Sequence, residues 1–264
     1  MRRDHCPWLS AEPRAGQRDG GSGAGAVLTA DIRTIKQTGS TNADLIALAK
    51  QGVAEGFWLR AEQQSGGRGR MARRWESPQG NLYCSTLVRL RPHDPPPGTL
   101  ALVAVVAVHE AVSLYMPSER VLIKWPNDLL VDGAKLCGIL LERADDAIVI
   151  GIGLNMAHHP EGLDRPVTSM ANSGAGKIDP GYFLETLADI FARWLEVWRV
   201  QGLAPIRTQW LKYAHGEGSA LKANLPDGTV VEGLFSGIGM DGALILRLAN
   251  GTSHVIHAGD IFLI

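Results

Sequence analysis

The segment formed by residues 61–75 constrains the fold of this chain more than any other part of its sequence. It contains four arginines and three glycines and ends in Trp75, a composition that an apolar core cannot accommodate. Residues 57–62, which overlap its start, and residues 82–90, which follow it, have the apolar and aromatic character of strands. The sequence therefore predicts an exposed loop between two strands, with glycine backbone and arginine forks that suit a phosphate or carboxylate.

The charge of the whole chain limits what this loop binds. The formal net charge is −1, so the positive loop is not part of a general basic excess of the kind that holds a long polyanion. The loop also lacks the Gly-Lys-Ser/Thr of a Walker phosphate loop and the third glycine of a dinucleotide fingerprint. A small anionic ligand is favoured, while a solvated turn and an arginine–glycine RNA-binding segment stay open as alternatives.

Cysteine usage and hydropathy indicate the compartment. Cys6, Cys84 and Cys137 have no metal-ligand spacing, which is ordinary for thiols in a reducing environment. The longest uninterrupted apolar run, residues 100–108, is far shorter than the ~20 residues that span a bilayer. The N-terminus has no apolar stretch of the kind that a secretory signal needs. We expect a cytoplasmic protein without membrane contact.

The two ends of the chain differ in texture from its middle. Residues 1–28 are rich in glycine and poor in apolar side chains, so we expect a flexible arm without a helix-turn-helix module and no DNA binding. Residues 217–264 carry short strand patterns separated by turn dipeptides, which indicates a small β-barrel. A domain boundary is expected near residue 216.

Residues 29–216 alternate between strand and helix patterns. Helices are predicted from Thr41, with Asp44 as its capping partner, to Gly52; over 99–115; and from the N-cap Asp179 to Gly202. The further strands are predicted at 121–125, 129–131, 136–141 and 147–156.

Several polar positions in this middle region lie at the ends of predicted elements. Ser40-Thr41-Asn42 opens a helix, and the N–H groups there favour polar or anionic partners. Asn127 and Asp128 follow a strand and can orient a neighbour or hold hydrated Mg²⁺. Lys135 stands at the mouth of a hairpin, where an ammonium can neutralise a carboxylate and a phosphate. Taken singly, each also has a structural explanation as a cap, a turn or a solvated lysine.

Glycines inside a strand are a separate signal. Gly151 and Gly153 weaken a strand unless a ligand or another main chain must approach it closely. Asn155 then places an amide at the end of the same strand, where a capping turn is the alternative explanation.

In this order, the elements resemble the biotin protein ligase family, whose members attach biotin to carboxylase carrier domains. The resemblance covers about residues 30–264 and implies an α+β fold, a mixed sheet flanked by helices, followed by a small C-terminal SH3-like β-barrel. The matching positions are Ser40 to Asn42, Gln64 to Trp75, Lys124 to Asp128, Lys135 to Leu140, and Gly151 to Met156.

The resemblance also implies roles for individual residues. Those expected to bind biotin are Ser40, Thr41, Asn42, Gln64, Gly67, Arg68, Gly69, Arg70, Lys135, Gly138, Gly151 and Gly153. Those expected to bind the nucleotide are Arg70, Arg73, Trp75, Asn127, Lys135 and Asn155, with Trp75 stacked on adenine. Lys135, Arg68 and Arg70 are the expected catalytic residues, and Asp128 is the candidate Mg²⁺ ligand.

The implied chemistry has two steps, with ATP and biotin as substrates and Mg²⁺ as the metal. The biotin carboxylate attacks the α-phosphorus of ATP, which gives biotinyl-5′-adenylate and pyrophosphate. A lysine of a biotin carboxyl carrier domain then takes the acyl group. Fixed cations are needed because the carboxylate and the phosphate repel each other. A homodimer is left open.

One departure from the family pattern lies in the loop. Family members often continue the Gly-Arg-Gly-Arg core with Arg-Gly-Arg, whereas this chain has Met71-Ala72-Arg73, so we expect the loop to fold less freely.

Two other functions compete with biotin activation. A lipoate ligase has a related catalytic fold and also works by adenylation, but Arg68-Gly69-Arg70 and the C-terminal barrel favour biotin. A nucleic-acid-binding protein could use the arginine loop and the barrel, but the near-neutral charge counts against it.

Overall fold

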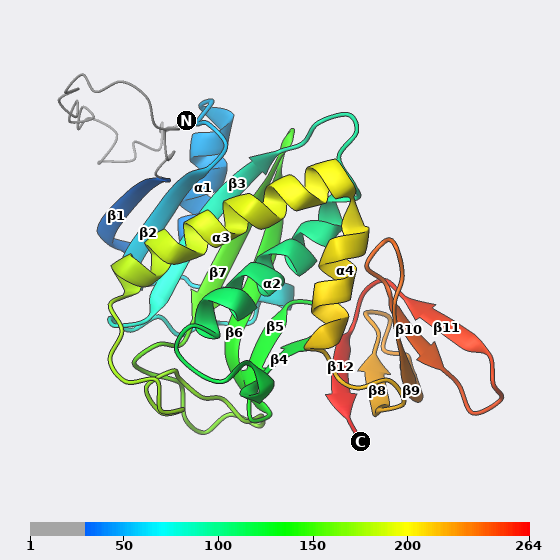
Figure 1. Ribbon diagram of the computed structural model, residues 1–264. Coiled ribbons are helices and arrows are strands. Elements are labelled where there is room, and N and C mark those ends of the chain that lie inside the picture. Colours follow the sequence, from blue (N-terminus) through cyan, green and yellow to red (C-terminus); the bar gives the residue numbers. More distant parts are fainter. Residues whose placement is uncertain (1–29) are drawn as a thin grey trace.

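A mixed seven-stranded sheet forms the centre of the molecule in a computed structural model that describes residues 30–264 (Figure 1). The expected flexible arm, residues 1–28, lies outside the described residues. The strand order is β1-β2-β3-β7-β6-β5-β4, with β1 and β2 parallel and every other pair antiparallel. The strands are β1 (Asp31–Thr38), β2 (Phe57–Gln64), β3 (Leu82–Arg89), β4 (Val121–Lys124), β5 (Asp128–Val131), β6 (Ala134–Ala144) and β7 (Ala147–Leu154).

Helices cover both faces of this sheet, which confirms the predicted α+β class. Helices α2 (Leu100–Val112) and α3 (Pro180–Gln201) pack over one face, against alternate β7 residues such as Ile150 and Ile152. Helix α1 (Thr41–Lys50) packs on the opposite face, against Leu87 and Val149. Because side chains alternate across a strand, the two apolar sets of β7 face different cores. Helix α1 covers only part of its face.

The helix boundaries follow local chemistry. Asp179 accepts hydrogen bonds from Gly181 and Tyr182, and Gly202 ends α3 with φ 74°, as predicted. The prediction that Thr41 and Asp44 cap α1 is wrong: Ser40 is the N-cap, since its Oγ accepts from the Ala43 N–H, while Asp44 accepts from Thr38. A short helix, α4 (Leu203–Lys212), was not predicted; its apolar contacts come from tertiary packing.

The strand that carries Lys135 begins earlier than predicted. Asp132 and Gly133 both have positive φ values, of 50° and 81°, and make a tight hairpin turn. Pairing therefore starts at Ala134 opposite Val131, which places Lys135 inside β6 and not ahead of it.

Residues after α4 form a second, antiparallel sheet of five strands in the order β11-β10-β9-β8-β12. This outcome confirms the predicted small β-domain, while its exact boundary near residue 216 stays a prediction. Its strands are β8 (Ala220–Asn224), β9 (Val230–Ile238), β10 (Leu244–Arg247), β11 (Ser253–Ile256) and β12 (Asp260–Leu263). Strand β12 lies nearest to the large sheet in Figure 1.

The helices were compared with the length and hydropathy that a membrane span needs. Between residues 30 and 264, none is both long enough and apolar enough to cross a bilayer.

A buried histidine gives the fold a defined response to pH. His109, on α2, is 2% exposed; its Nε2 lies 3.1 Å from the Val121 carbonyl oxygen and its ring lies 3.9 Å from that of Tyr213. Burial lowers the pKa of His109 from 6.5 to about 4. Between these two pH values the unfolded chain binds more protons at His109 than the folded chain does. The contribution of neutral His109 to the free energy of unfolding is therefore complete above pH 6.5 and is lost as the pH falls toward 4.

We expect His109→Gln to reduce this acid sensitivity, because the amide can still donate to Val121 and does not titrate. Urea unfolding above pH 6.5, and again between pH 6.5 and 4, measures how much of the free energy of unfolding is lost on acidification. His93→Gln, at an exposed position, is the control. Equal losses in the wild type and in His109→Gln would contradict the assignment.

Candidate active site

A cavity of about 370 Å³ opens on the part of the sheet that α1 leaves uncovered. Its floor is made by β6 and β7, and its walls by the start of α1, the loop after β2, the turn between β4 and β5, and β12 of the small domain. Most of the residues singled out in the sequence line this one cavity, including Ser40, Gln64, Arg70, Lys135 and Gly153.

The glycines of β6 and β7 form a flat patch on the cavity floor. Gly138 pairs directly with Gly153, and Gly151 lies one pleat further along β7, opposite Leu140. A Cβ at Gly153 would lie 2.6 Å from the Trp75 ring, and a Cβ at Gly138 3.1 Å from it. At Gly151 it would overlap the side-chain carboxamide of Asn42. Close approach therefore accounts for all three glycines, but the approaching groups are side chains, and not the ligand or main chain that was expected for Gly151 and Gly153.

The group that approaches the patch is Trp75. Its indole covers Gly138 and Gly153, in the space that the resemblance assigns to the biotin ring, and its Nε1 has no hydrogen-bond partner. Lys135 Nζ lies 5.7 Å from the ring centroid. The predicted stacking of Trp75 on adenine stays a prediction. A ring bound against the glycines requires the indole to move.

The polar start of α1 meets the end of β2. The Gln64 Oε1 accepts hydrogen bonds from the backbone N–H of Thr41, at 2.9 Å, and from its hydroxyl, at 3.2 Å. Asn42 donates to Glu142 at 2.8 Å and accepts from Ser85 at 2.6 Å. The structure thus brings the predicted polar residues together. Ser85 and Glu142 were missed, because only strand register places them beside α1.

Lys135 and Asp128 form an ion pair across the β5–β6 hairpin. Lys135 Nζ lies 2.5 Å from Asp128 Oδ1, and the two side chains are only 13% and 15% exposed. An irregularity between Leu129 and Leu130 shifts the pairing of these strands near the two residues. Asn127 donates to the Ile139 carbonyl, so its amide holds the β4–β5 turn against β6.

The predicted metal ligand does not form a complete site within the protein. The part of the chain that the structure describes contains no group of three or more ligating side chains around Asp128. Asp128 is instead the partner of Lys135. A hard cation held here would need oxygen ligands from a bound phosphate in addition to Asp128.

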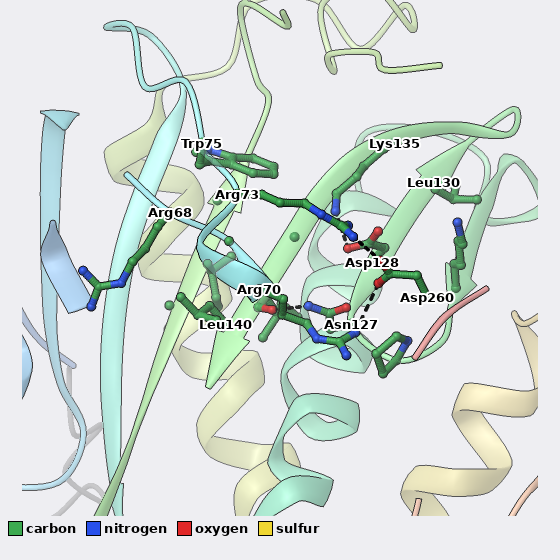
Figure 2. Close-up of a pocket in the computed structure, with 18 of the residues that line it drawn as sticks. Arg68, Arg70, Arg73, Trp75, Asn127, Asp128, Leu130, Lys135, Leu140 and Asp260 are labelled. Carbon is green, nitrogen blue, oxygen red and sulfur yellow. Dashed lines mark hydrogen bonds and ion pairs between the residues drawn. The ribbon is translucent and has the colours of Figure 1, made fainter. Parts of the chain in front are cut away.

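The loop arginines contact two different carboxylates. Arg73 pairs with Asp260, and Arg70 donates to the Gly259 carbonyl at 3.2 Å with Asp260 at 3.8 Å. Arg68 pairs with Glu142 at 2.8 Å and points away from the Lys135–Asp128 pair (Figure 2). Asp260, on β12, was not singled out in the sequence. The small domain thereby contributes a charged group to the cavity.

The loop residues that differ from the family pattern, Met71 and Ala72, adopt an unusual backbone conformation. Met71 and Ala72 both adopt positive φ, of 54° and 55°, where a Cβ costs roughly 1–2 kcal/mol per residue relative to glycine. The family's glycine would relieve this strain at the second position.

Two predicted site residues do not line the cavity. Gly67 is buried within the loop, where a Cβ would lie 2.6 Å from the Trp75 carbonyl oxygen. Asn155 is 2% exposed, and its amide donates to the Thr168 carbonyl at 3.1 Å. Both residues make contacts within the protein. The predicted contacts of Gly67 with biotin and of Asn155 with the nucleotide stay predictions.

Gly151→Ala is expected to lower stability by about 1–3 kcal/mol, because the new methyl group displaces the Asn42 carboxamide from Ser85 and Glu142. Thermal unfolding measures the effect. Gly98→Ala is the matched control, since nothing lies within 4 Å of the Cβ there. Equal melting temperatures for the two variants would show that the close contact at Gly151 is not required.

The sequence of most of this chain is similar to that of known proteins. Residues 34–155 match the model of the biotin/lipoate A/B protein ligase family, and residues 218–264 match that of the biotin protein ligase C-terminal domain. A biotin–acetyl-CoA-carboxylase ligase of Paracoccus denitrificans is 40% identical over 86% of this chain and 98% of its own length. One from Mycobacterium tuberculosis is 36% identical over 87% and 88%.

Among solved structures, a biotin protein ligase from Aquifex aeolicus in complex with biotin and ATP has the same fold, with a TM-score of 0.78. It is 24% identical, over 89% of this chain and 98% of that one. The two matched family models, and relatives of 36% and 40% identity that the chain covers over most of their length, show that the chain belongs to the biotin protein ligase family.

Proposed function

We propose that this enzyme activates biotin with ATP as biotinyl-5′-adenylate and transfers the biotinyl group to a lysine of a biotin carboxyl carrier domain. The observation that carries the proposal is the position of Lys135. Its ammonium lies 3.3 Å from the point where a Cβ would stand on Gly138, so a charged group is directly beside the glycine patch. A ligand with an apolar ring and a carboxylate tail matches that combination.

In the first step, a carboxylate oxygen of biotin forms a bond to the α-phosphorus, and the bond from that phosphorus to the bridging oxygen of the β-phosphate breaks. Pyrophosphate leaves with the electron pair. Lys135 neutralises the approaching anions, and Arg70, which lines the same cavity, adds a second donor from the loop. Fixed positive groups of this kind lower the barrier, because they need not reorganise during the reaction.

In the second step, the neutral amine of the carrier lysine attacks the acyl carbon of the mixed anhydride. The bond from that carbon to the phosphate oxygen breaks, AMP leaves with the electrons, and the amine loses its proton. The proposal includes closure of the arginine loop over the adenylate, which would limit access of water to the anhydride until the lysine arrives.

The remaining residues that line the cavity are assigned to parts of the two ligands. Thr41, Ser40 and Gln64 supply the polar groups for the ureido ring of biotin, and Asn42 lies beside them at the start of α1. After the loop rearranges, Arg68 is assigned with Arg70 to the carboxylate and the α-phosphate. Arg73, Trp75 and Asn127 are assigned to the nucleotide side. Asp128 would hold Mg²⁺ together with oxygens of the bound phosphates, and the metal would neutralise part of the phosphate charge.

The setting of the reaction is part of the proposal. We place the enzyme in the cytoplasm, with carboxylase carrier domains as its protein substrates. We propose no DNA-binding role, and we include formation of a homodimer as a property to be tested by solution mass measurement.

Biotin-dependent exchange of labelled pyrophosphate into ATP tests the first step. We expect exchange with biotin and Mg²⁺, and none when lipoate replaces biotin, since the C-terminal domain belongs to the biotin-specific model. Exchange with lipoate alone would assign the chain to the other branch of its family. No exchange with either acid, in folded protein, would refute the adenylation chemistry.

Lys135→Ala is expected to reduce exchange by at least about 10²-fold, because among residues 30–264 no other ammonium lies beside both the glycine patch and Asp128. Lys36→Ala, at an exposed position on the edge strand β1, is the matched control. Far-ultraviolet circular dichroism checks that both variants fold. Wild-type exchange by Lys135→Ala would remove Lys135 from the mechanism.

A further inference from the structure

One carboxylate beside the cavity, that of Glu142 on β6, has no part in the proposed reaction. Its Oε1 accepts from Arg68 Nη2 and its Oε2 accepts from Asn42 Nδ2, each at 2.8 Å. Among residues 30–264, those that line the cavity include Arg68 and Asn42 but not Glu142. Glu142 therefore acts on the cavity through these two partners, one from the arginine loop and one from the start of α1.

Strand register explains how Asn42 reaches Glu142. Ser85 on β3 pairs with Gly151 on β7, and Gly151 pairs with Leu140 on β6. Glu142 lies two residues after Leu140 and so on the same face of the sheet. The Asn42 carboxamide lies against Gly151 and is hydrogen-bonded to Ser85 and to Glu142. A glycine in the middle strand thus lets one side chain from α1 bridge three strands.

The bridge continues into the polar groups at the start of α1. Ser85 is fully buried, and its Oγ lies 2.8 Å from Thr41 Oγ1 as well as 2.6 Å from Asn42 Oδ1. Thr41 in turn donates to Gln64. Because a buried polar group left without a partner is costly, each of these side chains is held by the next. Through Asn42, Glu142 therefore helps to fix the groups assigned to the ureido ring.

The ion pair on the other oxygen of Glu142 is easier to exchange. The side chains of Arg68 and Glu142 are 39% and 24% exposed, against 13% and 15% for Lys135 and Asp128. Water screens a partly exposed pair, so breaking it costs little. Arg68 points away from the Lys135–Asp128 pair in Figure 2 and must leave Glu142 to reach a ligand there. A ligand carboxylate offers the guanidinium an equivalent acceptor.

We propose that Glu142 is a positioning residue with two tasks. One oxygen holds Asn42 in the polar pocket, and the other holds Arg68 until the carboxylate of biotin replaces it. The inference rests on the proposed function, which assigns Arg68 to that carboxylate, and deepens it by linking the arrival of the substrate to movement of the loop. Glu142 and biotin then compete for one guanidinium.

Calorimetric titration with biotin, and with its alcohol analogue biotinol, separates the two tasks without ATP. Glu142→Gln keeps a carbonyl oxygen for Asn42 but no longer carries the charge that holds Arg68. This variant is expected to bind biotin about threefold more tightly than the wild type does, the scale of a partly exposed ion pair. Its affinity for biotinol is expected to be unchanged, because biotinol has no carboxylate to compete for Arg68.

Glu142→Ala removes both contacts. We expect it to bind biotin and biotinol alike about tenfold more weakly than Glu142→Gln does, because the Asn42 amide loses its acceptor. Asp146→Asn is the matched control, since it removes an exposed ion pair with Arg89 at the turn of the same β6–β7 hairpin. It is expected to leave both dissociation constants unchanged.

A second background tests whether Arg68 carries the effect. In Arg68→Ala protein, Glu142→Gln is expected to leave biotin affinity unchanged, because no guanidinium remains to be released. A general structural defect at Glu142 would instead act in both backgrounds and on both ligands. Glu142→Gln preserves size and the Asn42 contact, so this comparison holds even if Glu142→Ala folds poorly.

Each outcome decides one point. Equal effects of Glu142→Gln on the two ligands, no effect on either, or the same effect on biotin in the Arg68→Ala background would overturn the exchange of Arg68. Unchanged affinities in folded Glu142→Ala would overturn the anchoring of Asn42. A wild type that binds biotin with the expected dependence on Glu142, yet shows no biotin-dependent pyrophosphate exchange, would overturn the adenylation and leave the role of Glu142 standing.

Discussion

The register between β6 and β7 is the constraint on which the rest of the site depends. It sets Gly138 opposite Gly153 and leaves a patch of bare backbone in the middle of a sheet that is otherwise covered by side chains. Strand glycines cost stability, so they persist where a group must come close. Here Trp75 and Asn42 come close enough that a single methyl group would collide with either. A one-residue slip would move the patch to the core side, under α2 and α3.

Charge pairing then determines how the cationic groups are held. Asp128 holds Lys135, Asp260 holds the arginines at positions 70 and 73, and Glu142 holds Arg68. Unpaired positive charges crowded around one cavity would repel one another, and these carboxylates reduce that repulsion. They also fix where each cation starts from when a ligand carboxylate or phosphate arrives. Because Asp260 belongs to β12, the small domain takes part in organising the loop.

Local sequence signals predicted most of the elements. The cap at Asp179, the stop at Gly202 and the turn at Asp132-Gly133 each act within a few residues, so their chemistry is visible in the sequence. The cap of α1 was placed one residue late, because Ser40 and Thr41 are both good caps and only the backbone conformation decides between them. Helix α4 was missed, since its stability comes from packing against distant apolar residues.

The sequence by itself determined the family, the order of the elements, and the chemical character of the site: glycines in a strand, an arginine loop, and a lysine at a hairpin. These follow from residue types at fixed spacings, which need no knowledge of distant contacts. Only the tertiary structure decided which groups meet: Ser85 and Glu142 with Asn42, Asp260 with the loop, Asp128 with Lys135, and Trp75 over the glycines. Those contacts join strands and domains far apart in the chain, and register and packing, not local propensity, fix their positions.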